Sequence, residues 1–163
     1  MGKYFFNLIL SILPSTRFFF IKSILFRLLC GKIGKNVSLN QGVKIMGDSD
    51  VYFGENSWVG INCFIATSEP ASVKVGKNCD IAPNVSIITG THKIGSNNRR
   101  AGEGKSLDVN IGDGVWIGSS CTINGGANIG NGTIIASGSV VMKGEFPENV
   151  IIAGVPAKVI KKL

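Results

Sequence analysis

A repeat of six residues constrains this sequence more than any other feature. From Ile33 almost to the C-terminus, and with a few interruptions, an aliphatic residue recurs at every sixth position, followed by a small or polar residue and a corner. The clearest run begins at Ile111 and reads IGDGVW, IGSSCT, INGGAN, IGNGTI, IASGSV, VMKGEF. Strands this short cannot form hairpins at this spacing, but they can stack as the flat faces of a coil whose aliphatic side chains point inward.

The corners of the hexads carry mainly Gly, Asn and Asp, which suit the left-handed backbone conformations that sharp corners need. Two earlier runs share the pattern, IGKNVS, LNQGVK, IMGDSD from Ile33 and VGKNCD, IAPNVS, IITGTH from Val75. Three hexads close one triangular turn in proteins with this pattern, so the repeat corresponds to about five coils. The sequence therefore predicts an all-β fold, a left-handed parallel β-helix of hexapeptide repeats, over residues 31–163.

Insertions interrupt the repeat at three places. Two extra residues fall near Val51-Tyr52, and a short insertion spans residues 68–72. The largest begins at Lys93, directly after His92, and is rich in Gly, Asn and charged residues. Because a long excursion from a regular coil is more often functional than accidental, we expect a functional loop at about 93–109.

Residues 1–30 form a separate apolar, helix-prone segment, in which Pro14 is expected to break the helix and Ser15 to cap the next one. Neither the part of this segment before Pro14 nor the part after it reaches the ~20 apolar residues that a transmembrane helix needs. A signal peptide is rejected because no small-residue cleavage site follows the apolar stretch. Three basic residues interrupt the second half: Arg17, Lys22 and Arg27.

Two interpretations of residues 1–30 remain open. The helices could cover the open end of the prism or pack against a neighbouring subunit. Alternatively, they could lie in a membrane surface with their basic residues toward the headgroups. The second is slightly favoured, because six apolar residues exceed what one face of a prism end can bury: Phe18, Phe19, Phe20, Ile24, Leu25 and Leu28.

The formal net charge of +7 predicts anionic partners, such as a phosphorylated cofactor or a lipid surface. The basic residues look dispersed, and no basic run is interleaved with aromatic residues, so nucleic acid is not expected as a partner. The cysteines have no C-x-x-C spacing and are expected to be buried, reduced thiols of a cytoplasmic protein. They are Cys30, Cys63, Cys79 and Cys121. A zinc site is not expected, because the chain has a single histidine.

That single histidine, His92, closes a hexad just before the long insertion. A corner side chain on a β-helix points outward, and the loop that follows could shield it from water. An imidazole titrates close to neutral pH, so it can accept a proton from a substrate hydroxyl and return it. We therefore expect His92 to be a general base.

From Asn62 to the C-terminus, about two-thirds of the chain, the sequence resembles the hexapeptide-repeat acetyltransferases, the group that contains galactoside and maltose acetyltransferases. The stretch IAPNVSIITGTH is similar to the segment that carries the catalytic histidine of that family. The stretch from GDGVWIGSS to GVPAKVIKK follows its C-terminal pattern. The resemblance implies transfer of an acetyl group from acetyl-CoA, without a metal or an acyl-enzyme.

The resemblance assigns roles to individual residues. His92 matches the base, Asn62 matches an asparagine near the acceptor, and Glu69 stands one residue away from an acidic acceptor-binding position. Trp116 and Ser119 match positions beside the CoA arm, where a backbone N–H can stabilise an oxyanion. Two further groups match the pantetheine contacts and the residues facing the nucleotide phosphates: Ser137, Met142 and Lys143, and then Lys158 and Lys161. Structural roles stay open for Asn62 as a corner residue, Trp116 as a packing residue and the two tail lysines as solvated charges.

The acceptor is less well defined than the acetyl donor. The displaced Glu69 and the hydrophobic N-terminus both depart from the sugar-binding relatives, and acetyltransferases of surface polysaccharides and their lipid-linked precursors look similar in both respects. The resemblance thus implies a sugar O-acetyltransferase that is a homotrimer with sites between subunits, cytoplasmic or at the inner face of the membrane. The alternatives are a xenobiotic or amino-sugar nitrogen as acceptor, or a non-catalytic scaffold.

Overall fold

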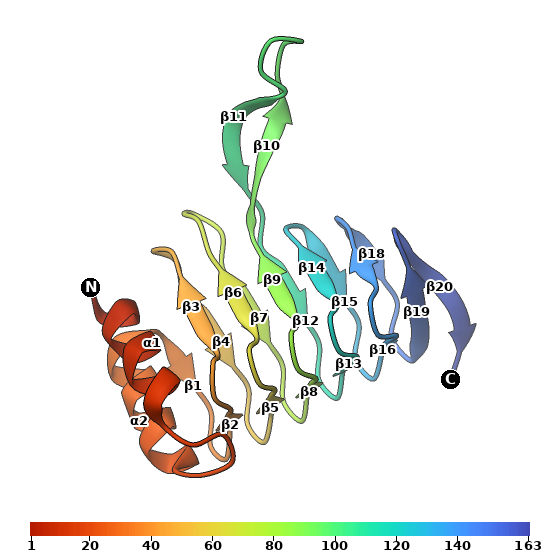
Figure 1. The fold of residues 1–163 in the computed structure, drawn as a ribbon. Helices are drawn as coiled ribbons and strands as arrows, with labels where there is room; N and C mark the ends of the chain where they lie inside the picture. The colour runs from red at the N-terminus through yellow and green to blue at the C-terminus, as the bar shows by residue number, and fades with distance from the viewer.

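The computed structural model describes residues 1–163, in which two helices are followed by a solenoid of short strands stacked coil on coil (Figure 1). The helices are α1 (Gly2–Ile12) and α2 (Phe19–Leu29). The first face of the prism contains β1 (Lys32–Ile33), β4 (Val51–Phe53), β7 (Val73–Val75), β12 (Val109–Ile111), β15 (Ala127–Ile129) and β18 (Gly144–Phe146). The second contains β2 (Ser38–Leu39), β5 (Trp58–Val59), β8 (Asp80–Ile81), β13 (Trp116–Ile117), β16 (Ile134–Ile135), β19 (Val150–Gly154) and β20 (Ala157–Lys162). The third contains β3 (Lys44–Met46), β6 (Phe64–Ala66), β9 (Ser86–Ile88), β14 (Thr122–Asn124) and β17 (Val140–Val141).

The strands within each face are parallel and in register, except that β20 folds back antiparallel on β19. The chain passes through the three faces in turn, which gives five full coils and part of a sixth. The predicted parallel β-helix is therefore confirmed.

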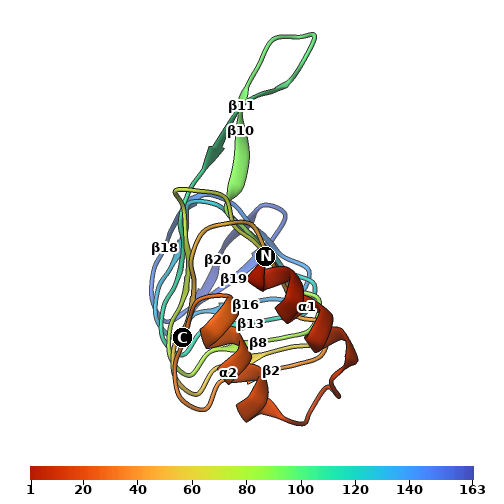
Figure 2. The ribbon, with the colours of Figure 1, turned by 90° about the vertical axis from the view of Figure 1, so that its left-hand side faces the viewer.

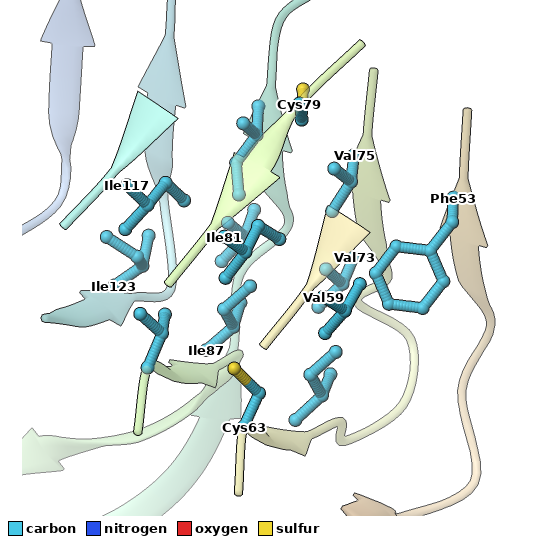
Figure 3. Packing of buried hydrophobic residues seen from close by; sticks show 14 of the residues in the cluster. Phe53, Val59, Cys63, Val73, Val75, Cys79, Ile81, Ile87, Ile117 and Ile123 are labelled. Carbon is cyan, nitrogen blue, oxygen red and sulfur yellow. The ribbon is translucent and has the colours of Figure 1, made fainter. Parts of the chain in front are cut away.

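The core of the prism contains the aliphatic residues that open the hexads and the small apolar residues, Val or Cys, at the fifth position of many of them. Thirty-three buried residues form one continuous cluster, and equivalent residues of successive coils lie directly above one another. On the third face, for example, Ile65, Ile87 and Ile123 occupy aligned positions. Figure 3 shows Ile87 and Ile123 among the buried residues of the stacked coils. All four cysteines are free and buried, as expected. Burial raises the pKa of the Cys63 thiol to about 11, which makes it a poor nucleophile.

The corner between the first and second faces is built from residues in the left-handed conformation. The six equivalent positions are Asn36, Asn56, Asn78, Gly114, Gly132 and Asn149. The three asparagines of the first coils also form a ladder, in which Asn36 Nδ2 donates to Asn56 Oδ1 at 3.1 Å and Asn56 Nδ2 donates to Asn78 Oδ1 at 3.2 Å. The backbone conformation, together with these hydrogen bonds, accounts for the Gly and Asn bias of the repeat.

The helix pair covers the open end of the first coil (Figure 2). The Phe26 ring lies edge-on to Phe53 of the first face, with ring centroids 5.4 Å apart, and to Phe6 of α1 at 5.5 Å. Asn7 both donates to and accepts from the backbone of Ile45, at 2.8 and 2.9 Å. These contacts show that the inner side of residues 1–30 caps the prism, as in the first of the two interpretations; the second concerns the outer side of the helices.

Two details of the N-terminal segment differ from the sequence prediction. Helix α2 begins at Phe19, and the cap position belongs to Phe18, so Ser15 is not the N-cap; its hydroxyl donates to Gln41 Oε1 at 2.9 Å instead. Lys22 does not face outward, because its Nζ is drawn inward to the carbonyl oxygens of Pro14 at 2.7 Å and Ser15 at 3.0 Å. Burial lowers the pKa of Lys22. Neither helix is long and apolar enough to span a membrane.

The long insertion is a β-hairpin, not an irregular loop. Strands β10 (Gly90–Ile94) and β11 (Ala101–Ser106) pair antiparallel and project sideways from the prism (Figures 1 and 2). We call residues 90–106 the arm. The arm begins before Lys93, so His92 lies within its first strand. The hexad pattern had instead predicted His92 at a corner of the coil.

Asn56 tests how much the corner conformation contributes to stability. Asn56→Val should lower the free energy of unfolding by about 2 kcal/mol, because a β-branched residue resists the left-handed conformation and the ladder is lost. Asn56→Gly should cost less, since it loses the ladder but keeps the conformation. Chemical denaturation of the three proteins measures both changes, and equal losses would show that the conformation is not what the corner selects.

Candidate active site

His92 lies midway along the first strand of the arm, where it pairs with Gly104. Its Nδ1 is 2.9 Å from the carbonyl oxygen of Gly102 on the opposite strand. A carbonyl can only accept, so this contact favours the tautomer with the proton on Nδ1. The lone pair of Nε2 is then free to accept a proton from another molecule. The arm holds the ring but does not shield it, since His92 is exposed in the single chain, contrary to the expected wall around it.

Glu69 lies at the base of the arm. Its turn joins β6 to β7 at the corner between the third and first faces, and its carbonyl oxygen accepts a hydrogen bond of 2.9 Å from the Ser106 hydroxyl. Ser106 in turn pairs with Gly90, two residues before His92. Glu69 and His92 therefore belong to the same edge of the prism.

Asp108, which belongs to no sequence motif, anchors the returning strand of the arm. Its carboxylate accepts from the Ser72 backbone N–H at 2.6 Å and from the Ser72 hydroxyl at 3.0 Å. These hydrogen bonds hold the pKa of Asp108 below its ordinary value. Asp108 thus joins the end of the long insertion to the short insertion of residues 68–72. No local sequence pattern could have indicated this contact.

Met142 and Lys143 follow β17, at the same edge as the arm but two coils farther along. Met142 is exposed, and its Sδ lies 3.6 Å from Asn124 Nδ2. Lys143 lies across Gly126, where any side chain would meet Lys143 Cγ at 2.7 Å. Gly126 also has a φ of +85°, so both space and conformation require glycine there.

Asn62, Ser119 and Ser137 lie at the opposite edge, the corner between the second and third faces. Asn62 is an exposed corner residue with a φ of 58°, as its structural interpretation required. Ser119 and Ser137 stack in neighbouring coils with their Oγ atoms 3.5 Å apart. Ser137 and Met142 are five residues apart across one strand, so these two edges are separated by roughly 17 Å.

Trp116 is the exposed residue of β13 on the second face, three residues before Ser119. Along this face it aligns with Ile134, then with Ile151, and finally with Lys161 of the last strand. Lys158 is opposite Ala153 on the same β19–β20 pair, and a register shift between Ile151 and Ile152 brings both lysines to the outer side. The outer surface thus carries a row from Trp116 to Lys161.

The structure does not bring the predicted site residues together within one chain. His92, Glu69, Met142 and Lys143 lie at one edge of the third face. Asn62, Trp116, Ser119, Ser137, Lys158 and Lys161 lie at the other edge or on the second face beyond it. The predicted site residues of one chain therefore form two groups at separate edges of the prism.

A groove of about 750 Å³ lies beside Glu69, and His92 is not among the residues that line it. Its lining is mainly polar and comes from the first three coils: Lys32, Asp48, Ser49, Asp50, Val51, Tyr52, Glu69, Pro70, Ser72, Val73 and Lys74. No group of three or more His, Cys, Asp or Glu side chains that could hold a metal ion is present.

Family models match two parts of the prism. Residues 108–143 match the bacterial transferase hexapeptide (six repeats), and residues 51–88 match the hexapeptide repeat of succinyl-transferase. Galactoside O-acetyltransferase of Escherichia coli is 34% identical over 80% of this chain, which spans 63% of that protein. A Saccharomyces cerevisiae protein assigned as an acetyltransferase is 40% identical over 87% of this chain and 71% of its own length.

Solved structures agree with these matches. A galactoside acetyltransferase in complex with coenzyme A superimposes with a TM-score of 0.76 and 30% identity, covering 99% of this chain and 78% of that one. A hexapeptide-repeat acetyltransferase of Vibrio cholerae, complexed with acetyl coenzyme A, gives a TM-score of 0.82 over 99% of this chain and 85% of that one. At 22% identity, the second shows the shared fold alone.

The Asp108 anchor should make the arm sensitive to acid. A carboxylate whose folded-state pKa is lowered stabilises the fold above its unfolded pKa and loses that contribution as the pH falls through the folded value. We therefore expect the arm to loosen below the ordinary Asp pKa of 3.8, and Asp108→Ala to loosen it at neutral pH. Hydrogen exchange of residues 90–106 measures this, with Glu148→Ala, an exposed carboxylate in the last coils, as the control. Equal exchange in the two variants would contradict the anchor.

The repeat, the prism and these similarities agree, and the chain belongs to the hexapeptide-repeat acetyltransferases, left-handed parallel β-helix proteins.

Proposed function

We propose that this protein is an O-acetyltransferase that moves an acetyl group from acetyl-CoA to a sugar hydroxyl of a surface polysaccharide or its precursor. The observation that carries the proposal is the hydrogen bond from His92 Nδ1 to the Gly102 carbonyl, which leaves Nε2 as a base on an arm that extends beyond its own prism. The relatives named galactoside O-acetyltransferase support a sugar acceptor. Those named for lipopolysaccharide and colanic acid biosynthesis support a surface glycan.

The reaction requires a base that takes one proton from the acceptor hydroxyl and later gives it to the leaving thiolate. The sugar hydroxyl attacks the thioester carbonyl while His92 Nε2 takes the hydroxyl proton. The carbonyl oxygen becomes an oxyanion that a backbone N–H near Ser119 can stabilise. The tetrahedral intermediate then collapses, the C–S bond breaks, and the CoA thiolate recovers the proton from His92. The products are the acetylated sugar and free CoA.

The division of the site between two edges supports a homotrimer. The arm edge of one chain carries the proposed base, and the opposite edge carries the positions beside the CoA arm. When parallel prisms pack around a threefold axis, the arm edge of each faces the other edge of its neighbour, so three complete sites form. The site residues thus act between chains: His92 and Glu69 from one, and Asn62, Trp116 and Ser119 from the next.

Acetyl-CoA fits the outer row of the second face. Trp116 and Lys161 are three strand spacings apart, roughly 14 Å, which suits a cofactor that is long, flexible and charged at one end. Lys158 and Lys161 would meet the phosphates, while Ser137, Met142 and Lys143 would follow the pantetheine. We also propose a cytoplasmic location at the inner face of a membrane, which residues 1–30 contact peripherally.

Replacement of the base tests the mechanism. His92→Ala should lower turnover by roughly a hundred- to ten-thousandfold, because the proton transfer loses its catalyst. Thiol release from acetyl-CoA with a panel of sugars and amino sugars measures turnover and also separates the candidate acceptors. Lys93→Ala, the next residue on the same strand, is the control for disturbance of the arm. Near wild-type turnover in His92→Ala would remove His92 from the mechanism.

The tail lysines test the path of CoA. Replacement of both Lys158 and Lys161 by Ala should raise the KM for acetyl-CoA more than it lowers kcat, with an effect that shrinks as salt rises. Lys162→Ala is a matched control, because Lys162 is opposite the buried Val150 and belongs to the other side of the strand pair. An unchanged KM at low salt would return the two lysines to the role of solvated charges.

A further inference from the structure

The helix pair is apolar on two opposite sides. The inner side, with Phe6, Leu10 and Phe26, packs on the end of the prism, where Phe26 reaches Phe53 of the second coil. The outer side carries nine apolar residues that expose between 38% and 78% of their surface. They are Tyr4, Phe5, Leu8 and Ile12 of α1, and Phe18, Phe20, Ile21, Ile24 and Leu28 at or within α2. We call this set the outer helix face.

The spacing of these residues makes the outer helix face continuous. Within α1 the residues Tyr4, Phe5, Leu8 and Ile12 fall on one side of the helix at 100° per residue, and Phe20, Ile21, Ile24 and Leu28 do the same within α2. The residues that pack on the prism share the opposite side of each helix. The two helices lie side by side across the end of the prism, so their outer sides face away from it together (Figure 2). Helices that are apolar all round are normally buried, and here half of that surface has no partner within the chain.

The net charge of the molecule is concentrated at the same end. Residues 1–47 contain seven Lys and Arg and no Asp or Glu, while residues 48–163 contain ten of each. The helices and the first coil therefore carry the whole formal net charge of +7. The expectation of dispersed basic residues is wrong in this respect, because the excess positive charge is concentrated at one end of the prism. Arg17, Arg27, Lys32 and Lys35 are exposed there, and Lys22 is the buried exception.

Asp48 is the acidic residue nearest to this face, in a groove beside Tyr4, and the other charged residues of the helices and the first coil are all basic. An apolar face bordered mainly by positive charge matches an anionic lipid surface. A second copy of the chain would bring the same positive charge against it, which disfavours that occupant. We propose that the outer helix face docks the prism end-on onto an anionic membrane, with its apolar residues among the acyl chains and its basic residues at the headgroups.

This docking fixes the height of the proposed base above the lipid. The arm leaves the prism after β9 in the third coil, two strand spacings beyond the first coil, and the helix layer adds the width of one helix. His92 then lies roughly 20 Å above the membrane contact, on an arm that runs parallel to the surface (Figure 1). The next step rests on the proposed function. A base at this height suits an acceptor that is itself held in the membrane, namely a lipid-linked glycan whose reacting hydroxyl is several sugars away from its lipid anchor.

Vesicle co-sedimentation of the full chain tests the docking. The protein should bind vesicles of phosphatidylglycerol mixed with phosphatidylcholine, bind phosphatidylcholine alone at least tenfold more weakly, and lose binding as salt rises. The variant Phe5→Ser/Leu8→Ser/Phe20→Ser/Leu28→Ser should lose binding while keeping its thermal stability, since all four side chains are exposed. The control variant Ile160→Ser/Leu163→Ser removes exposed apolar residues from the opposite end and should bind normally.

The sequence supplies a matched pair for the electrostatic part. Lys35 and Lys77 occupy the same corner of the first and third coils, in IGKNV and VGKNC. Lys35→Gln should weaken vesicle binding about fivefold, and Lys77→Gln should leave it nearly unchanged, because only the first lies near the docked end.

The outcomes separate this inference from the proposed function. Wild-type protein that ignores anionic vesicles, or a four-serine variant that still binds them, would overturn the docking whatever the enzyme does. Dissociation of oligomers in the four-serine variant would identify a second copy as the occupant and would also overturn it. Vesicle binding without any acetyl transfer would contradict the proposed function and leave the docking intact.

Support for the membrane-held acceptor is a kcat/KM at least tenfold higher for a vesicle-bound glycolipid than for its free glycan, with the advantage lost in the four-serine variant.

Discussion

The in-register stacking of one coil on the next is the interaction on which the rest of the structure depends. Most strands of the prism contribute one or two buried apolar side chains, and these lie over the equivalent residues of the preceding coil. A single coil of two- and three-residue strands could bury little surface and satisfy few backbone groups by itself. Stability therefore comes from neighbours, and both ends of the stack need cover: the helix pair at the first coil and the antiparallel β20 at the last.

The sequence predicts the prism well because its signal is periodic. The residue at every sixth position is aliphatic and the corners are Gly or Asn, and both features report directly on burial and on backbone conformation. The arm was predicted only as an interruption. Its hairpin depends on pairing between Gly90 and Ser106, and the charged, Gly-rich sequence has no alternation that indicates strands. Ser15 was predicted as a helix cap from its neighbours in the sequence alone. In the folded chain, contacts with Gln41 and Lys22 determine where it lies.

Candidate site residues could be proposed from the sequence, but their arrangement could not. His92 and Trp116 lie in adjacent coils along the chain, yet the first leaves at one edge and the second occupies another face. Distance along the chain says nothing about which edge of a prism a residue reaches. The anchoring of the arm by Asp108 likewise joins two insertions that are separated by an entire coil. These features arise from how coils are stacked, which only the folded structure supplies.

The arm leaves and re-enters the prism without disturbing it. Strand β12, which follows the arm, pairs with β7 in unbroken register, Val109 opposite Val73 and Ile111 opposite Val75. The coil therefore closes as though the arm were absent, and the arm itself contributes no residue to the core. The register of the prism is consequently encoded separately from the sequence of the arm. We expect the arm to tolerate changes in length or composition while the prism retains its register and its fold.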